Sequence, residues 1–286
     1  MKVLVLGASG MLGNAMIRVL ADDKSHEVVG TARSETVKRF FTPELAGNII
    51  AGIDVEDTDK LTQLITEVKP DVVINCIGLV KQLDEADDPL HAISINALLP
   101  HRLAKLCNQT GSRLVHFSTD CVFSGKKGGY LETDIPDAQD LYGRTKLLGE
   151  VDYPHTITLR TSIIGHELST SHGLIGWFLA QNGSIKGYTH AIFSGLPTCE
   201  LARVVLEFVL PRNELHGIFH VASAPISKYE LLTLVNKHYG KGLQINADDH
   251  LKINRSLDSS SFYEATGYLA PAWSQLVEKM HFFSMK

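Results

Sequence analysis

Residues 2–13 read KVLVLGASGMLG, and a segment with helical periodicity, residues 14–21, follows directly. The apolar run before the glycines is typical of a buried strand, and the GxxGxxG spacing is typical of a strand-to-helix turn. Gly7 allows a tight turn, Gly10 lets backbone amides approach a diphosphate, and Gly13 lets the helix pack closely on the strand. We therefore predict a dinucleotide site at this turn, where the positive end of the helix meets the phosphates.

Short runs rich in β-branched residues or leucine recur along the first half of the chain, separated by segments long enough for helices. They are residues 2–6, 27–32, 48–53, 71–76, 113–117 and 156–159. Strands of this kind that alternate with helices predict a parallel sheet with helices on both faces, the doubly wound α/β fold.

After about residue 160 the alternation loosens. A short apolar run, residues 217–221, and two amphipathic segments, residues 228–238 and 272–280, are what remains of it. We expect a dinucleotide-binding domain over residues 1–160 and a smaller C-terminal α/β lobe over residues 161–286. That lobe would bind mainly substrate, and some of its segments would return to the first domain.

Composition excludes several classes of function. The chain of 286 residues has a net charge of -5, which argues against nucleic-acid binding, and no apolar run approaches the length of a membrane span. Its four cysteines show no CxxC spacing, so we expect reduced thiols and a cytoplasmic protein. His216 and His220 have HxxxH spacing but lie in a β-prone segment without the glutamate of a zinc-protease helix, and we predict no metal site.

The end of the second predicted strand indicates which dinucleotide binds. A carboxylate that accepts from the ribose 2'-hydroxyl of NAD stands about 20 residues after such glycines, but here Arg33 is followed by Ser34. A guanidinium suits a 2'-phosphate, which favours NADPH over NADH; the alternative is an exposed surface arginine. Asp54, after the third strand, would accept from the adenine amino group, or is simply a charge at a helix N-terminus.

Tyr142 and Lys146 are four residues apart and share one face of a predicted helix. A nearby ammonium would lower the phenol pKa and orient the cofactor ribose, so that the tyrosine exchanges a proton with a carbonyl oxygen. The motif STDCVF, residues 118–123, ends a predicted central strand, where open α/β sheets place their sites. Both motifs therefore indicate one catalytic site.

The sequence resembles the extended short-chain dehydrogenase/reductases, in particular the dTDP-4-dehydrorhamnose reductase-like (RmlD-type) sugar nucleotide-binding group. The motifs that carry the resemblance run nearly end to end: GASGMLG (7–13), NCIG (75–78), STDCVF (118–123), YGRTKLLGE (142–150), LRTS (159–162), GLPT (195–198) and RSLD (255–258). It implies a Rossmann-type fold and a catalytic triad of Thr119, Tyr142 and Lys146. Asn96 would be a fourth member that supports a proton-relay water, or a residue with a helix-surface or capping role.

The resemblance also implies the ligands. The cofactor-binding residues would be Gly7, Ser9, Gly10, Met11, Leu12, Gly13, Arg33, Ser34, Asp54, Val55, Cys76, Gly78, Asn96, Tyr142 and Lys146. Substrate would contact Thr119, Asp120, Cys121, His172 and Arg255, the last as a phosphate ligand or, alternatively, in a surface ion pair. The activity implied is NADPH-dependent reduction of a nucleotide-linked 4-keto-6-deoxysugar, in dTDP-rhamnose or related deoxysugar biosynthesis for cell-surface polysaccharide, by a protein that could be a homodimer.

Cys121 departs from the pattern of the simple reductases, which usually carry tyrosine there, and of related dehydratases, which carry glutamate. The GDP-fucose synthase group carries a cysteine at this place with a histidine further along, and His172 matches that spacing. An epimerase-reductase that uses Cys121 and His172 is therefore an alternative, although cysteine is also a common buried residue and plain reductases carry a similar HG pair. One branch of the group is a noncatalytic regulatory subunit, but the intact triad favours an enzyme, and we favour a reductase alone.

Overall fold

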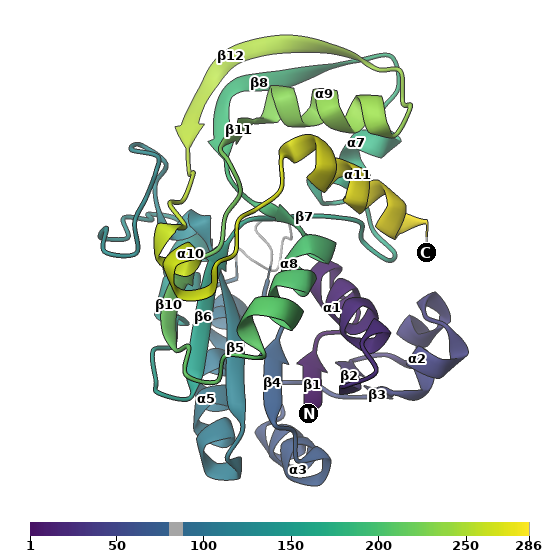
Figure 1. Cartoon of the computed structure of the whole chain (residues 1–286), viewed down its shortest axis with the longest axis vertical. Coiled ribbons are helices and arrows are strands. Elements are labelled where there is room, and N and C mark those ends of the chain that lie inside the picture. Colours follow the sequence, from purple (N-terminus) through teal and green to yellow (C-terminus); the bar gives the residue numbers. More distant parts are fainter. Residues whose placement is uncertain (80–87, 286) are drawn as a thin grey trace.

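The computed structural model describes residues 1–79 and 88–285. They form a large parallel sheet covered by helices and a smaller lobe that lies beyond the carboxyl ends of the strands, at the top of the view in Figure 1. No helix within these residues is long and apolar enough to cross a membrane.

The main sheet has seven strands, all parallel, in the order β10-β6-β5-β4-β1-β2-β3. Their bounds are β1 (Lys2–Leu6), β2 (Glu27–Ala32), β3 (Ile49–Ala51), β4 (Val72–Asn75), β5 (Arg113–Thr119), β6 (Thr156–Thr161) and β10 (Gly217–His220). The order reverses at β1, since the chain runs outward to β3 and then crosses to β4 on the other side. The predicted doubly wound fold is confirmed, and open sheets of this kind bind ligands at such a reversal.

Helices cover both faces of the sheet. Because successive side chains of a strand point to opposite faces, Val3 packs in the cluster that includes α1 (Met11–Asp22), while Leu4 packs in the cluster that includes α3 (Thr58–Val68) and α5 (Leu99–Thr110). Both strand residues are fully buried. This two-sided burial explains why β1 reads as an unbroken apolar run.

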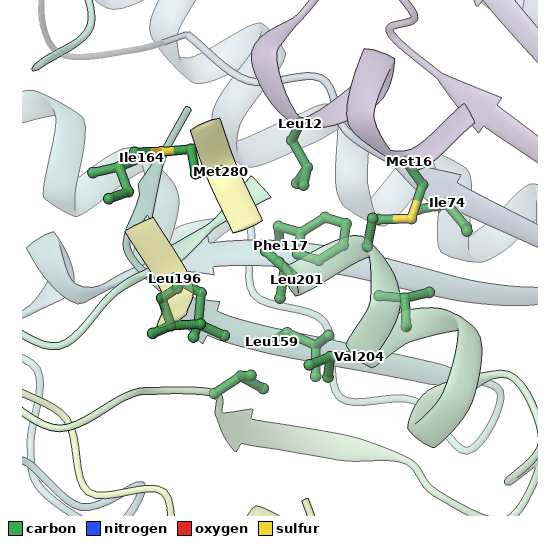
Figure 2. Close-up of a cluster of buried hydrophobic side chains, with 14 of the residues drawn as sticks. Leu12, Met16, Ile74, Phe117, Leu159, Ile164, Leu196, Leu201, Val204 and Met280 are labelled. Atoms are coloured by element: carbon green, nitrogen blue, oxygen red, sulfur yellow. The ribbon is translucent and has the colours of Figure 1, made fainter. Parts of the chain in front are cut away.

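Figure 2 shows part of the first cluster, in which Leu12 and Met16 of α1 lie near Phe117 of β5 and Leu201 of α8 (Thr198–Val204). All four side chains are buried. Burying an apolar side chain of this size contributes roughly 1.5–3 kcal/mol, so this cluster holds the glycine turn against β5.

The smaller lobe is built on a three-stranded sheet in the order β11-β8-β12. β8 (Ser184–Phe193) pairs parallel with β12 (Gln244–Asn254) and antiparallel with β11 (Ile226–Ser227). α9 (Lys228–His238) packs on β8 over the residues predicted as helical, and α11 (Trp273–Ser284) packs on α9. The lobe therefore places the first turn of α9 and the ends of β8 and β12 close together.

The chain returns to the main sheet after entering the lobe. β10 follows the expected domain boundary at residue 160, yet it pairs with β6 of the main sheet. α8 also follows that boundary and packs on α1. His220 of β10 is fully buried and contacts the guanidinium of Arg160, whereas His216 is exposed. The two histidines therefore do not share an environment.

The remaining helices and short strands connect these layers. They are η1 (Glu35–Phe40), α2 (Pro43–Gly47), α4 (Pro89–Ala92), η3 (Ile93–Leu98), η4 (Asp120–Val122), α6 (Leu141–Leu148), β7 (Ile163–Ile164), α7 (Leu174–Ala180), β9 (Leu196–Pro197), η5 (Val205–Val209) and α10 (Ser260–Thr266).

A buried ion pair fixes the end of α6 to the sheet. Glu150, just after α6, accepts hydrogen bonds from Arg160 of β6 at 2.8 and 2.7 Å and from the Ser118 hydroxyl of β5 at 2.6 Å. Both charged side chains are 4% exposed. Because a buried charge is costly without its partner, this network specifies where α6 lies on β5 and β6.

Candidate active site

A cavity of about 440 Å³ opens at the carboxyl ends of β1, β4, β5 and β6. The main sheet contributes the glycine turn, the segment after β4 and the end of β5. The lobe contributes the end of β8, the start of α9 and the residues around the end of β12. The cavity therefore lies at the reversal of the strand order, where the fold predicts a ligand.

The glycine turn has the geometry that a bound diphosphate requires. Gly7 has a φ of +91°, which favours glycine, and a Cβ on Gly13 would lie 2.0 Å from the Gly7 carbonyl oxygen. The Gly10 amide donates to that same oxygen at 3.0 Å. A side chain at Gly13 would therefore clash with the turn, and Gly10 brings the backbone to the cavity.

The N-terminus of α1 is not capped by a side chain and carries no acidic residue in its first turn. Its amides and positive dipole end are therefore available to an anion, as phosphate binding requires. Met11 and Leu12 line the cavity, while Ser9 is exposed on the turn itself. The residues present fit the pyrophosphate of a dinucleotide.

Arg33 and Ser34 follow β2 directly and are both exposed. The Ser34 hydroxyl caps η1 by accepting from the Thr36 amide at 3.2 Å. Arg33 forms no salt bridge with any residue that the structure describes, so its guanidinium is free to meet a ligand. This placement is compatible both with a 2'-phosphate contact and with a plain surface arginine.

Asp54 and Val55 lie after β3, and neither lines the cavity. Asp54 is exposed and accepts from the Glu56 amide at 3.0 Å, in a turn that precedes α3. Val55 is buried in the core under α3. One carboxylate oxygen of Asp54 thus stabilises the turn, and its role toward adenine stays a prediction.

Asn96 lies in a π-helical turn, η3, and is buried. Its Oδ1 accepts from the Leu79 amide at 3.0 Å and its Nδ2 donates to the Thr145 hydroxyl at 3.4 Å. A Cβ on Gly78 would lie 3.5 Å from Oδ1 of Asn96 and 3.8 Å from Nζ of Lys146. Asn96 therefore joins the cavity segment after β4 to α6, and it is not a helix-surface residue.

The three predicted catalytic side chains line the same cavity. Thr119 is the last residue of β5, and Tyr142 and Lys146 lie one turn apart on α6, whose first turn is capped by Asp140. Lys146 Nζ donates to the Phe117 carbonyl oxygen at 2.7 Å. The sequence placed these three residues together, and the structure brings them to one site.

Burial controls the protonation of this site. It raises the pKa of Tyr142 well above its usual range, with Cys121 adding to the effect, while a hydrogen bond with Thr119 lowers it in part. Burial also lowers the pKa of Lys146 to about 8, against the charge of Glu150. The expectation that Lys146 lowers the phenol pKa in the free protein is wrong, because desolvation prevails. The phenol is therefore a neutral acid with a proton to give.

Cys121 and His172 are not brought together. Cys121 lines the cavity, and burial raises the pKa of its thiol to about 12. His172 is exposed just before α7 and does not line the cavity, although its neighbour Gly173 does. In this structure the thiol is a poor base, and His172 lies outside the cavity that Cys121 lines.

Asp120 and Arg255 line the cavity together with Cys121, Phe193 and Lys228, and we call this part of the cavity the substrate end. Arg255 Nε donates to the Phe123 carbonyl oxygen at 2.9 Å, and Arg255 forms no salt bridge with a described residue. Asp120 is buried, and burial raises its pKa although the charge of Arg255 acts in the opposite direction. The cation is thus anchored through one nitrogen and faces the cavity.

Sequence reasoning missed Lys228 and Phe193. Lys228 is the first residue of α9, and its Nζ lies 3.7 Å from the centre of the Phe193 ring at the end of β8. Both residues line the cavity. The sequence around Lys228 reads ISKYE, which signals only a helix start, so no local pattern reveals its place in the site.

The fold and this cavity define the class of the protein, a short-chain dehydrogenase/reductase of the extended type. Comparison with known proteins narrows it further: a family model described as RmlD substrate binding domain matches residues 1–260, and the chain belongs to that family.

Individual relatives agree with the family. The chain is 31% identical over 234 residues to the probable low-salt glycan biosynthesis reductase Agl14 of Haloferax volcanii, covering 78% of this chain and 75% of that protein. It is 28% identical over 241 residues to dTDP-4-dehydrorhamnose reductase of Aggregatibacter actinomycetemcomitans, covering 80% and 76%. It is also similar to methionine adenosyltransferase 2 subunit beta of Danio rerio, at 29% identity over 249 residues, covering 80% and 71%.

Among solved structures, dTDP-4-dehydrorhamnose reductase of Bacillus anthracis in complex with NADP superimposes with a TM-score of 0.79. The two chains are 19% identical, and the match covers 99% of each. This likeness shows that the two proteins share a fold over their whole length.

Proposed function

We propose that the protein is an NADPH-dependent reductase of a nucleotide-linked 4-keto-6-deoxysugar, acting in deoxysugar biosynthesis for cell-surface polysaccharide, as in the dTDP-rhamnose route. The observation that carries the proposal is the convergence of Thr119, Tyr142 and Lys146 on one cavity beside the glycine turn. The names of the two reductase relatives support the same reaction class.

When bound, NADPH supplies a hydride to the keto carbon. The chain's own contribution is to the oxygen, where negative charge grows in the transition state. Tyr142, whose raised pKa keeps the phenol neutral, donates its proton there. The Thr119 hydroxyl donates to Oδ1 of Asp120 at 3.2 Å in the free protein and would turn to donate to the same substrate oxygen. Lys146, with a pKa of about 8, is mostly charged at neutral pH and stabilises the phenolate that proton donation leaves.

The cofactor preference rests on Arg33. Its exposed guanidinium at the end of β2, free of salt bridges to the described residues, supports binding of a 2'-phosphate, and hence NADPH over NADH. Gly7, Gly10 and Gly13 would hold the pyrophosphate, and Lys146 the nicotinamide ribose.

Two other functions are less well supported. An epimerase-reductase would need a thiolate at Cys121 and an acid at His172, but burial raises the thiol pKa and His172 lies outside the cavity. A regulatory subunit is suggested by the similarity to methionine adenosyltransferase 2 subunit beta. The intact set of Thr119, Tyr142 and Lys146 favours an enzyme, because a protein that only bound the dinucleotide could lose Tyr142 with little penalty.

The same proposal gives the enzyme a nucleotide-sugar as its substrate and the cytoplasm as its place of action, as a monomer or a homodimer. Its four cysteines are free thiols, which suits a reducing compartment.

The test is NADPH oxidation against a panel of dTDP-, UDP- and GDP-linked 4-keto-6-deoxysugars, followed by determination of the product configuration. We expect turnover with at least one member and a 4-hydroxy product. Binding of NADPH without turnover of any member would instead support the regulatory function.

A further inference from the structure

Two cations reach the substrate end of the cavity from the lobe. Lys228 enters from the first turn of α9 and lies over the face of Phe193 at 3.7 Å, a cation–π contact that holds the ammonium in place. Arg255 enters just after β12 and is anchored through Nε to the carbonyl oxygen of Phe123. This anchor leaves both terminal nitrogens of the guanidinium without a hydrogen-bond acceptor among the residues that the structure describes.

The charge of this pair is not balanced by the protein. Neither Lys228 nor Arg255 has a carboxylate within salt-bridge distance in residues 1–79 and 88–285. Asp120 is the acid whose field they share: burial raises its pKa, and the charges of Arg255 and Lys228 act in the opposite direction. Two cations thus face one buried acid, and a partly desolvated excess of positive charge is costly unless an anion binds.

The acidic residue in the first turn of α9, Glu230, does not balance the two cations. Ser227 and Glu230 form a capping box, in which the Ser227 hydroxyl accepts from the Glu230 amide at 3.1 Å and Glu230 accepts from the Ser227 amide at 3.1 Å. The Glu230 carboxylate is thereby committed to the cap. Among the described residues at this end of the cavity, Lys228 and Arg255 are the ones with cationic side chains.

We propose that Lys228 and Arg255 together bind a phosphate of the nucleotide diphosphate of the substrate. The planar guanidinium offers two parallel donors and the ammonium a point charge, and both groups suit phosphate oxygens. The inference rests on the proposed function for its substrate class, a nucleotide-sugar. It makes Lys228 a substrate-binding residue of this site.

The test is calorimetric titration of the NADP⁺-bound protein with dTDP, UDP and GDP, each compared with its nucleoside. Lys228→Met removes the charge and keeps most of the side-chain volume. Lys237→Met is the matched control, because Lys237 is an exposed lysine on the same helix. Thermal unfolding of each variant verifies that the fold is retained.

We expect Lys228→Met to weaken binding of the preferred nucleoside diphosphate about 10-fold or more, the range for a hydrogen bond to a charged group, with nucleoside affinity unchanged. Lys228→Arg should restore most of the affinity, and Lys237→Met should change nothing.

Equal affinity of Lys228→Met and wild type for every one of these anions would overturn the inference, as would a wild-type protein that binds none of them. The outcome is separable from that of the proposed function. Loss of diphosphate binding in Lys228→Met without reduction of any 4-keto sugar retains the oxyanion site and rejects the reductase. Reduction of a 4-keto sugar that Lys228→Met does not affect would retain the reductase and reject the oxyanion site.

Discussion

The ammonium of Lys146 donates a hydrogen bond of 2.7 Å to the main-chain carbonyl of Phe117. This contact joins α6 to β5 two residues before Thr119, so the helix that carries Tyr142 is held in a fixed position relative to the strand that carries the threonine. Glu150 strengthens the same junction through Ser118. The geometry of the proposed proton donor is therefore built into the packing of α6 on the sheet.

Replacement of Tyr142 by phenylalanine should remove most of the turnover and leave NADPH affinity nearly unchanged, because the lost hydroxyl acts on the substrate oxygen in the transition state. The expected fall in kcat is about 10²-fold or more, the range for a positioned acid. Steady-state kinetics and NADPH titration measure the two effects. A variant as active as wild type would mean that another group donates the proton.

Arg33→Ala should reduce the preference for NADPH over NADH about 10-fold or more, the magnitude of a hydrogen bond to a charged group. Its affinity for NADH should stay the same, because NADH has no 2'-phosphate. Fluorescence titration with both dinucleotides measures the ratio, and Arg39→Ala, at an exposed arginine of η1, is the control. An unchanged ratio would make Arg33 an ordinary surface residue.

Turnover should fall as the pH rises through about 8, because Lys146 then loses its ammonium. The sign follows from burial, which lowers the pKa of this lysine toward neutrality, so the charged form is retained below pH 8 and lost above it. The pH profile of kcat between 6 and 10 is the measurement. Burial also lowers the pKa of Lys228 to about 8. The same falling limb in Lys228→Met would therefore assign it to Lys146, and a profile flat to pH 10 would reject the assignment.

Cys121→Ser should preserve reduction within a modest factor. A plain reductase needs no base at carbon, and the thiol pKa of about 12 makes Cys121 a weak candidate for one. The measurement is incorporation of solvent deuterium at the sugar carbons beside the ketone, with NADP⁺ bound so that substrate is not consumed. Wild type should show none. Rapid incorporation that disappears in the variant would establish the epimerase-reductase instead.

Local patterns were enough to predict six of the seven strands of the main sheet and to place the three proposed catalytic residues near one another. The apolar run of β1, the glycine turn after it and the spacing of Tyr142 and Lys146 each act within one element and its neighbours, so the sequence carries them directly. The end of β5 was predicted at Phe117, whereas the strand continues to Thr119 and thereby sets the threonine at the edge of the cavity.

The substrate end was less predictable, because it depends on how the lobe packs over the sheet. Lys228 reaches the cavity only through the pairing of β8 with β11 and the start of α9, and nothing in its sequence neighbours signals that position. The spacing of His172 suggested a partner for Cys121, but the chain leaves it exposed before α7. Asn96 is buried in a π-helical turn, and no local pattern in the sequence predicts that turn.

The central claim is that this chain transfers a hydride to a sugar ketone and that Tyr142 supplies the proton. NADPH carrying deuterium at both C4 positions, incubated with the nucleotide 4-keto-6-deoxysugar that the panel selects, tests it most directly. We predict one deuterium at sugar carbon 4 for each NADPH consumed, and at least about 10²-fold slower transfer in Tyr142→Phe. NADPH consumption without deuterium at that carbon, or no consumption with any member of the panel, would contradict it.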